Sequence, residues 1–315
     1  MRDVTEYANS VFEQPWWLDI VAPQKWGEVF VEEKGKIIAR LPYVLDNKCI
    51  KNPSLTQTLG IWMDNSIKEK VRGNSHLYKQ KEIINELIGK LPKSKSISIT
   101  LDSSLEYVLP FRWLGFNIEP TFSYRISNIK NIVNFDNIIS KNAFEKCKRA
   151  SKKIVADIDN SDNGIRTIIE LMDSTFKKQN RKNPHDRKFL FNMISTSILH
   201  NNGAIIIARD ENGIAHSGAF YLYDTNVCYY LIGGKDLKYH NDYSQYLVIR
   251  KGLEFAKTVS NDFDFEGSMI EGIENFFRQF GGTQVINYHV SKQGIASEIF
   301  NIAKPKIKKL IGYKN

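Results

Sequence analysis

Several features of other protein classes are missing from this sequence, and each absence excludes one class. The three cysteines, Cys49, Cys147 and Cys228, are scattered without a paired spacing, which argues against a disulfide framework and against a zinc site. No apolar run approaches the ~18 residues that a membrane span needs, and the first residues lack the apolar stretch of a signal peptide. The sequence also has no nucleophile elbow and no P-loop. We therefore expect a soluble, cytoplasmic protein without a bound metal.

What the sequence does contain is material for a large core and an excess of positive charge. With 42% hydrophobic residues in a chain of 315, it can bury one large or two medium-sized cores, and its length favours two domains. The net charge of +9 favours phosphates, nucleic acid or an anionic membrane as partners, without choosing among them. A nucleic-acid binder is one interpretation, and it rests on the charge alone.

The most regular stretch begins with three strands in succession, expected over residues 203–213, 215–223 and 227–234. The first two are joined by an Asn-Gly turn, because both residues tolerate the positive φ of a hairpin. Gly233 and Gly234 allow the third strand to bulge or splay where a ligand approaches closely.

Two helices and a fourth strand complete this stretch. Asp242 is the expected N-cap of a helix whose apolar residues recur at three- and four-residue spacings. A strand follows over residues 262–269, and a helix over residues 271–280 is stopped by two glycines. Under the period of two, Asp264 and Glu266 share one face of that strand. They are interpreted as a solvated edge, as partners of Arg278 and Lys235, or as catalytic groups.

The order of three strands, helix, strand and helix resembles the GNAT acyltransferase fold. Residues 229–234, 263–269 and 276–282 are similar to the FemABX-like branch, whose members carry two GNAT-like domains in tandem. That branch includes the aminoacyl-tRNA-dependent transferases that build peptidoglycan cross-bridges, and similar proteins occur among cell-surface polysaccharide functions. The resemblance is strongest over residues 203–292. It implies an α/β (α+β) protein in which each domain is a mixed, mainly antiparallel twisted sheet flanked by helices.

The N-terminal half follows the same plan. A short helix is expected to start near Pro15, a favoured first helical residue, and a strand pair is expected around Lys34-Gly35. The further expected elements of this half are a helix over residues 76–91, a strand over 96–101, a short helix over 105–114 and a strand over 116–126. We place a boundary near residue 130, which gives an N-terminal domain of residues 1–130 and a C-terminal domain of residues 131–315.

The C-terminal domain begins with a basic helix from Ser140, which is either a solvated face or a phosphate-contacting face for a nucleotide or tRNA. Helices over residues 165–177 and 189–200 are joined by a polar, basic loop that we interpret as mobile and able to close over a donor. Residues 295–311 are expected to form helical segments broken at Pro305. The lysines near the end are either a solvated tail or a contact to anionic lipid at the inner face of the membrane.

The resemblance implies an acyl donor, but one GNAT motif is missing. The usual glycine-containing pyrophosphate cradle before the helix is replaced by residues 235–245, which makes close approach of a CoA pyrophosphate doubtful. Backbone amides at the helix N-terminus can still bind phosphate. We expect no tightly bound cofactor, and acyl-CoA, acyl-carrier protein or aminoacyl-tRNA as the co-substrate.

Acyl transfer to an amine requires a base, proximity and donors that face the developing oxyanion. Glu266 is the expected base, with Asp264 beside it, and backbone N–H groups near residues 232–234 are the expected oxyanion donors. Tyr230 either protonates a leaving group or is a core tyrosine. His216 is either a base near the acceptor or a buried, hydrogen-bonded histidine.

Polar and aromatic residues are expected to bind the substrate. Trp16 and Trp17 form either core or one wall of an acceptor groove, and the polar run in residues 53–62 either binds a sugar or peptide or is a satisfied strand edge. The expected substrate-binding residues are Trp16, Trp17, Thr56, Gln57, Trp62, Arg125, Gly233, Gly234, Lys235, Tyr243, Ser268 and Arg278.

We therefore expect an acyltransferase that moves an N-acyl or aminoacyl group to an amine of a cell-envelope sugar or peptide precursor, either a small molecule or lipid-linked. The alternative is a non-catalytic GNAT-fold binding protein that recognises a nucleotide-linked glycan. Replacement of Glu266 separates the two, because an enzyme would lose turnover and a binder would not.

Overall fold

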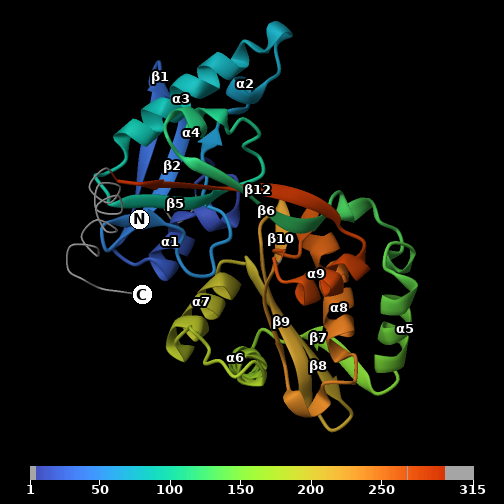
Figure 1. Ribbon diagram of the computed structural model, residues 1–315. Coiled ribbons are helices and arrows are strands. Elements are labelled where there is room, and N and C mark those ends of the chain that lie inside the picture. The colour runs from blue at the N-terminus through green and yellow to red at the C-terminus, as the bar shows by residue number, and fades with distance from the viewer. Residues whose placement is uncertain (1–4, 268, 295–315) are drawn as a thin grey trace, which may run out of the picture. The chain divides into compact units, whose positions relative to one another are not determined.

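The computed structural model describes residues 5–267 and 269–294. Ser268, the expected C-terminal helix and the basic tail lie outside the described residues. Within them the chain forms two compact units, one of residues 5–121 and 286–294 and one of residues 122–285. Figure 1 shows the elements of both units along the chain.

The first unit is built on an antiparallel hairpin extended by further strands. Its sheet has the order β1 (Trp26–Glu33), β2 (Lys36–Asp46), β3 (Cys49–Lys51), β5 (Ser96–Leu101) and β12 (Thr283–Gln293), with β4 (Trp62–Met63) against β2. β3 and β5 run parallel, and the other pairs are antiparallel. The helices are α1 (Pro15–Val21), α2 (Asn65–Lys68), α3 (His76–Lys90) and α4 (Leu109–Trp113). Ile83, Ile84 and Leu87 form the apolar stripe of α3, and they are buried in the core with Ile99 and Leu101 of β5.

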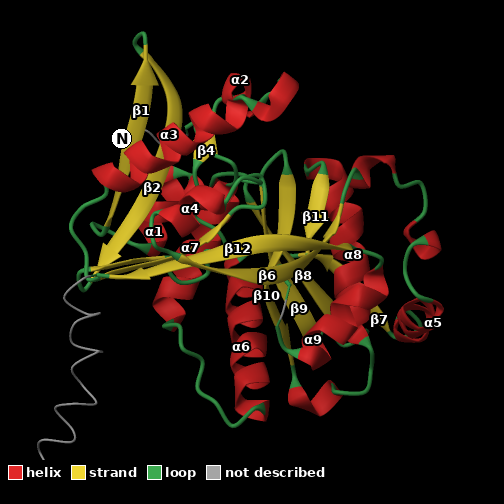
Figure 2. Ribbon diagram, turned by 45° about the horizontal axis from the view of Figure 1, so that its top comes forward, coloured by secondary structure: helices red, strands yellow, loops and turns green. Residues whose placement is uncertain are grey.

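The second unit contains a sheet with helices on both faces (Figure 2). Its order is β6 (Asn117–Ile126), β11 (Asp262–Asp264), β10 (Val227–Lys235), β9 (Ala215–Tyr223), β8 (Gly203–Asp210) and β7 (Ile154–Ile158). β10 and β11 are parallel, and their neighbours are antiparallel. The helices are α5 (Lys141–Ala150), α6 (Asp162–Lys178), α7 (Arg187–Leu199), α8 (Ser244–Val259) and α9 (Glu271–Phe277), which continues as η6 (Arg278–Phe280).

The two faces of this sheet are covered by different helices. Gly218 of β9 leaves room for α6, since an added Cβ would lie 3.2 Å from Ile168. Tyr221 points to the other face, where its hydroxyl donates to the backbone oxygen of Val248 in α8 at 2.9 Å. Figure 1 accordingly shows α6 and α7 on one side of β8 and β9, and α5, α8 and α9 on the other.

Most of the expected elements are present. The three strands that begin at Gly203, the helix starting at Pro15 and the basic helix after Ser140 are confirmed, and the Ser140 hydroxyl caps α5 by accepting from Ala143 N at 3.1 Å. Gly281, with φ +88°, ends η6, the continuation of α9, as expected. The sequence predicted a longer strand over residues 262–269, but β11 ends at 264 because the chain turns there.

β7 and β12 are among the strands that were not predicted, and the division of the chain differs from the expected one. β7 and β12 carry mostly half-buried or exposed side chains, so neither shows a clear apolar period. The expected boundary lay near residue 130, with all later residues in the second domain. The compact units instead divide after residues 121 and 285, because β12 returns to pair with β5 of the first unit.

Candidate active site

The parallel strands β10 and β11 separate soon after they begin, which opens a gap in the sheet of the second unit. Their pairing covers three residue pairs and ends at Tyr229 and Asp264. β10 continues beside β9 as far as Lys235, with a shift in register between Tyr230 and Ile232. The bulged third strand expected from the sequence is therefore present. Tyr230 follows directly after the last paired residue of β10, and Glu266 lies two residues after the last paired residue of β11.

Glu266 lies on a strained turn at this gap. Its φ is +60° and that of Gly267 is +56°, a region that is unfavourable for a residue with a Cβ. A Cβ at Gly267 would overlap the carbonyl oxygen of Phe122. Glu266 as a whole is partly exposed, but its carboxyl oxygen Oε1 is buried. Burial, and after it the charge of Asp264, raises the pKa of the Glu266 carboxyl well above its ordinary value.

Asp264 is buried and held by several donors. Arg125 donates to its Oδ2 from Nε at 3.0 Å and from Nη2 at 2.9 Å, a bidentate geometry typical of strong pairs. The hydroxyl of Ser123 and the backbone N–H of Glu266, the latter at 2.7 Å, both donate to Oδ1. Asp264 therefore positions the turn that carries Glu266, and Arg125 is its ion-pair partner.

One interpretation paired the two strand carboxylates with Arg278 and Lys235, but these cations contact other groups. Arg278 is exposed and lies 3.5 Å from the carboxylate of Glu274. The ammonium of Lys235 lies 2.6 Å from Asp242. The expectation of a solvated edge is also wrong, because both strand carboxyl groups are buried.

Tyr230 projects from β10 toward α8. Gln245 donates from Nε2 to the phenol oxygen at 2.8 Å, and the ring packs edge-on against Phe277 with centroids 5.4 Å apart. Burial raises the pKa of the phenol well above its usual range, and the Gln245 hydrogen bond only partly opposes this. A Cβ at Gly233 would overlap the phenol oxygen, and one at Gly234 would lie 2.5 Å from the backbone of α6. Both glycines are thus required by close approaches, on opposite faces of β10.

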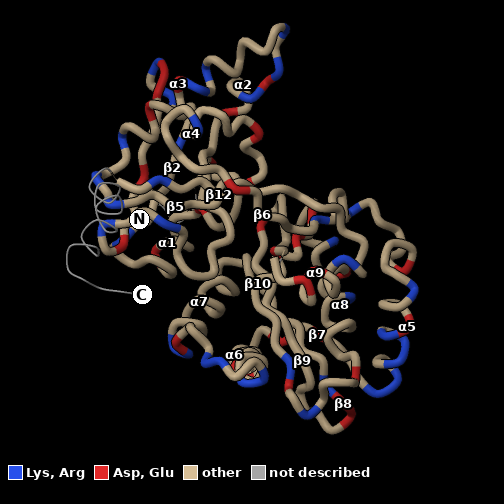
Figure 3. Tube along the Cα trace, in the orientation of Figure 1, with Lys and Arg blue, Asp and Glu red and all other residues tan. Residues whose placement is uncertain are grey.

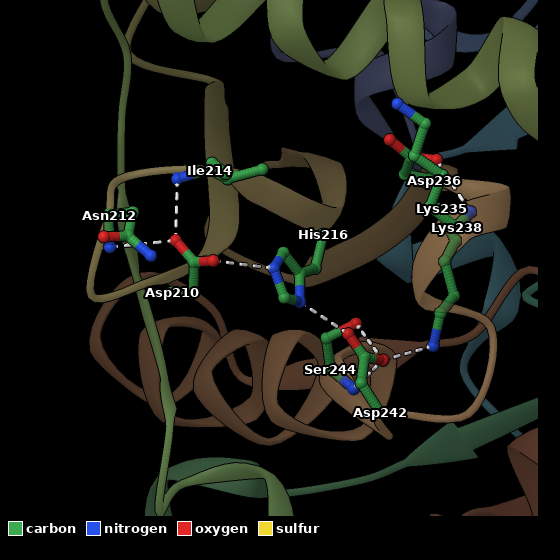
Figure 4. A network of polar contacts seen from close by, with 9 residues as sticks. All are labelled: Asp210, Asn212, Ile214, His216, Lys235, Asp236, Lys238, Asp242 and Ser244. Atoms are coloured by element: carbon green, nitrogen blue, oxygen red, sulfur yellow. Dashed lines mark hydrogen bonds and ion pairs between the residues drawn. The ribbon is translucent and has the colours of Figure 1, made fainter.

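His216 is the centre of a separate network before α8 (Figure 4). Its Nδ1 lies 2.7 Å from Asp242 Oδ2 and its Nε2 lies 3.3 Å from Asp210 Oδ2. The ring stacks on Tyr239 with centroids 3.6 Å apart and an interplanar angle of 8°. Both nitrogens face carboxylates, which can only accept when ionised. This geometry supports the interpretation as a buried, hydrogen-bonded histidine rather than that of a general base.

The N-terminus of α8 is occupied by a carboxylate of the chain itself. The expected N-cap, Asp242, lies one residue before the observed N-cap, Tyr243, which has φ +61°. Oδ1 of Asp242 nevertheless accepts from Ser244 N at 3.0 Å and from Ser244 Oγ at 2.8 Å. Burial raises the pKa of Asp242, but hydrogen bonds from Lys235 and Ser244 outweigh that effect and hold it below its ordinary value. The position where a phosphate would bind at a helix N-terminus is therefore already filled.

A pocket of about 380 Å³ opens beside this network. Arg149 at the end of α5 and Lys153 in the following turn contribute two cations, and Asp210, Asn241 and Tyr243 line it as well. The basic helix, interpreted as either a solvated or a phosphate-contacting face, and Tyr243, expected to bind substrate, both contribute to this pocket. Its lining has charges of both signs.

The expected acceptor-groove residues of the first unit are mostly core. Trp16 and Trp17 of α1 are buried, and Trp17 Nε1 donates to the hydroxyl of Thr56 at 2.9 Å. Thr56 is itself buried, so its polar atom is satisfied inside the unit. Gln57 and Trp62 are partly buried. The structure thus supports the core interpretation for the two tryptophans on α1.

Gln245 and Asp210 belong to these networks and were not predicted as site residues. Gln245 lies on the helical face that points to Tyr230, and a polar residue in the apolar stripe of α8 is the signal that could have marked it. Asp210 is the last residue of β8, next to the turn, where an Asp is usual for local reasons. Among the described residues no cluster of His, Cys, Asp and Glu could hold a metal ion. No described helix is both long and apolar enough to cross a membrane.

Comparison with known proteins identifies the fold. No family model matches the sequence, and no curated protein resembles it significantly in sequence. The structure of FemX is similar with a TM-score of 0.67 and 13% identity, over 93% of this chain and 94% of that chain. The C-terminal domain of a putative lysylphosphatidylglycerol synthetase from Agrobacterium fabrum is similar with a TM-score of 0.55 and 9% identity, over 92% of this chain and 94% of that chain.

A third structure bears on the tandem arrangement. A tandem GNAT protein from the clavulanic acid biosynthesis pathway is similar with a TM-score of 0.52 and 7% identity, over 88% of this chain and 86% of that chain. At these identities the likeness concerns the fold, and it extends over most of both chains in each comparison. The chain therefore has the fold of these structures, which include FemX and a tandem GNAT protein.

Proposed function

We propose that this protein is an N-acyl- or aminoacyltransferase that works in the gap beyond the β10–β11 pairing. The observation that carries the proposal is Glu266, a buried carboxyl of raised pKa on a strained turn where the two strands separate. Strained backbone and a strongly perturbed carboxyl together are typical of catalytic positions. A carboxylate with a raised pKa is also a better base toward an amine than an exposed glutamate.

The residues around the gap can divide the reaction among them. The acceptor nitrogen attacks the acyl carbon, and Glu266 takes the proton that the nitrogen loses. The phenol of Tyr230 accepts a hydrogen bond from Gln245, so its own hydrogen can be donated to the leaving oxygen or sulfur. Backbone N–H groups of β10 after the bulge are the proposed donors to the oxyanion.

The donor that suits this site has no pyrophosphate at the start of α8. The carboxylate of Asp242 fills that position and would repel a phosphate. An aminoacyl ester of tRNA or a carrier-protein thioester fits better than free acyl-CoA. A protein with a similar structure is named for lysylphosphatidylglycerol synthesis, which supports aminoacyl transfer. The acceptor, an amine of a cell-envelope sugar or peptide precursor, and a cytoplasmic location are parts of the same proposal.

Transfer from labelled donors tests the proposal. Total tRNA charged with radiolabelled amino acids is incubated with the protein and a UDP-linked peptidoglycan precursor or an amino sugar, and parallel reactions contain acetyl-CoA or acyl-carrier protein. We expect label in the acceptor with at least one donor, and we expect Glu266→Gln to lower the rate by about 100-fold or more. Since the pKa of Glu266 is raised above 4.5, the rate should still increase with pH above that value.

The matched control is Glu254→Gln, which changes an exposed carboxylate of α8 that pairs with Arg250 at 2.7 Å. It should keep the wild-type rate. A normal rate in Glu266→Gln would remove this residue from the chemistry. If no donor is consumed while a UDP-linked glycan binds, the protein is a binding protein rather than a transferase.

A further inference from the structure

The side of α3 and α4 that faces away from the core of the first unit carries several exposed apolar side chains. In α4, Phe111 belongs to that core and is fully buried, whereas Leu109 and Trp113 are 52% and 58% exposed. Residues four positions apart lie on the same side of a helix, so Leu109 and Trp113 share the outward side of α4. On α3, Tyr78 is 75% exposed. The fold therefore leaves two aromatic rings and a leucine at the surface of this unit.

Contacts between the two helices join these side chains into one surface. The rings of Tyr107 and Trp113 pack edge-on with centroids 6.3 Å apart. The ammonium of Lys81, on α3, lies 5.2 Å from the centre of the Trp113 ring. Tyr78 lies three residues before Lys81, so the two are neighbours on the surface of α3. We call Tyr78, Tyr107, Leu109 and Trp113 the aromatic patch.

Lys and Arg recur around the aromatic patch, and Figure 3 shows them as blue segments along α3 and in the turn before it. Residues 70–82 and 105–113 contain five Lys and Arg but two Asp and Glu, so cations are in excess there. The cations are Lys70, Arg72, Lys79, Lys81 and Arg112.

Acidic side chains neutralise part of this charge. Lys79 pairs with Glu33 of β1. Lys70 lies 3.6 Å from Glu106, and because both side chains are exposed, this pair contributes little in water. Glu82 is an exposed residue of α3. The other three cations are also exposed, so the surface around the aromatic patch keeps a net positive charge.

We propose that the aromatic patch docks the protein on the surface of an anionic phospholipid bilayer. Tyr and Trp combine an apolar ring with a polar tip, which suits the boundary between lipid headgroups and hydrocarbon. Leu109 and the indole of Trp113 would reach the start of the acyl chains. Arg72, Lys81 and Arg112 would contact lipid phosphates, because cations beside an anionic leaflet are attracted to it. This inference goes beyond the proposed function and does not depend on it.

Lys81 favours a lipid surface over a second protein as the partner. Its ammonium lies over the ring of Trp113, so a protein that covered the ring would also remove the ammonium from water. Burial of an unpaired charge is costly, and lysine is depleted at the cores of protein interfaces. At a bilayer the lysine stem can lie along apolar groups while the ammonium extends to the headgroups.

Flotation of the full chain with vesicles tests the proposal. We expect the wild type to bind vesicles made of equal parts of phosphatidylcholine and phosphatidylglycerol, to bind pure phosphatidylcholine much less, and to bind less as salt is raised from about 50 to about 500 mM. Trp113→Ala with Leu109→Ser should lower the partition coefficient by about tenfold or more. Circular dichroism shows whether this variant is folded.

The matched control replaces two apolar residues of the second unit that are even more exposed. Val133→Ala with Leu199→Ser removes side chains that are 94% and 81% exposed, and it should change the partition coefficient by less than about twofold. An equal loss in the patch and control variants would overturn the proposal. So would a wild-type protein that never floats with anionic vesicles.

A second pair of variants tests the charge. Lys81→Glu with Arg112→Glu should lower the partition coefficient on anionic vesicles by about tenfold or more and should weaken its salt dependence. Lys148→Glu with Lys152→Glu, on and after α5, has the same charge change at exposed positions and should lower it by less than about threefold. Equal losses in the two variants would mean that total charge, rather than this surface, determines binding.

Fluorescence locates the contact directly. Vesicles with brominated acyl chains should quench the tryptophan fluorescence of the wild type, and Trp113→Phe should lose most of this quenching while it still floats. Quenching that persists in Trp113→Phe would place the contact elsewhere and overturn the proposal. A lipid-free dimer that dissociates in the patch variant would overturn it as well, since the patch would then bind a second copy of the chain.

Vesicle binding is measured without donor or acceptor, so this proposal and the proposed function fail separately. A protein that transfers an acyl group and never floats lacks only the membrane contact. A protein that floats through the aromatic patch and transfers from no donor lacks only the transferase activity.

Discussion

The backbone N–H of Glu266 donates a 2.7 Å hydrogen bond to Oδ1 of Asp264. The sequence predicted that these two carboxylates share one face of a strand, whereas in the fold they have different roles. Asp264 is paired with Arg125, and it fixes the turn. Glu266 is the carboxyl whose pKa is raised.

Asp264→Asn should destabilise the fold strongly. It removes an ion-pair partner of Arg125, whose side chain is largely buried, and breaking a buried ion pair costs about 3–5 kcal/mol. Urea denaturation measures the loss. Asp262→Asn is the control, because an amide oxygen can still accept from the backbone of Asn128 as the carboxylate does at 3.0 Å, and it should cost less than about 1 kcal/mol. A similar small loss in Asp264→Asn would show that the pair adds little.

Alanine at the adjacent glycines Gly233 and Gly234 should lower the stability by unequal amounts. Gly234→Ala forces a Cβ to 2.5 Å from the backbone of α6, which cannot move alone, and overpacking of this kind costs about 1–3 kcal/mol. Gly233→Ala meets the hydroxyl end of the Tyr230 side chain rather than a backbone, so it should cost less stability and displace the phenol from Gln245. Thermal melts and transfer rates distinguish these outcomes.

The control for this pair is Gly272→Ala in α9, where an added Cβ meets nothing within 4 Å. It should be neutral or stabilising by about 0.5–1 kcal/mol. A Gly234→Ala protein as stable as wild type would contradict the close packing of β10 against α6.

Free CoA should bind weakly, with a dissociation constant poorer than about micromolar. The reason is that Asp242 already accepts from Ser244 at the start of α8, where a pyrophosphate would bind, and no glycine-containing cradle precedes it. Isothermal titration checks this expectation. A sub-micromolar constant would mean that the donor is an acyl-CoA after all.

Glu13 should make stability depend on pH. It is fully buried, and burial, followed by the charge of Asp102, raises its pKa from 4.5 to about 7. The folded state then holds a proton that the unfolded state has lost, so stability is greatest below pH 4.5 and falls as pH rises to about 7. The shift from 4.5 to about 7 corresponds to a loss on the order of 3 kcal/mol.

Urea denaturation at about pH 5 and about pH 8 measures this loss. In Glu13→Gln the decrease between the two values should be smaller than in wild type, although the variant loses stability at both. Its amide group is a poorer partner for the backbone N–H of Asn9, which the carboxylate now binds at 2.7 Å. An equal decrease of the free energy of unfolding in both proteins would show that Glu13 is ionised at both pH values.

The local pattern of the sequence was sufficient for most elements of the second unit. Strands β8 to β10 and helix α8 have apolar residues at the periods of strands and helices, and turn residues separate them. Pro15 begins α1 and Gly281 ends η6, and in each case the backbone preference of that one residue is the cause. These features depend on neighbours along the chain, so they can be predicted without the fold.

The tertiary structure determined the contacts between residues that are far apart in the sequence. Arg125 and Asp264 are separated by 139 positions, and His216 meets Asp242 from another element across 26 positions. The burial of Glu266, which raises its pKa, depends on where β11 ends and on how the strands separate. β12 forms a strand because the edge of β5 needs hydrogen-bond partners. The side chains of β12 are mostly half-buried or exposed, so their pattern does not indicate a strand. The residue types of the candidate site were present in the sequence, whereas their protonation and partners follow from packing that only the folded chain provides.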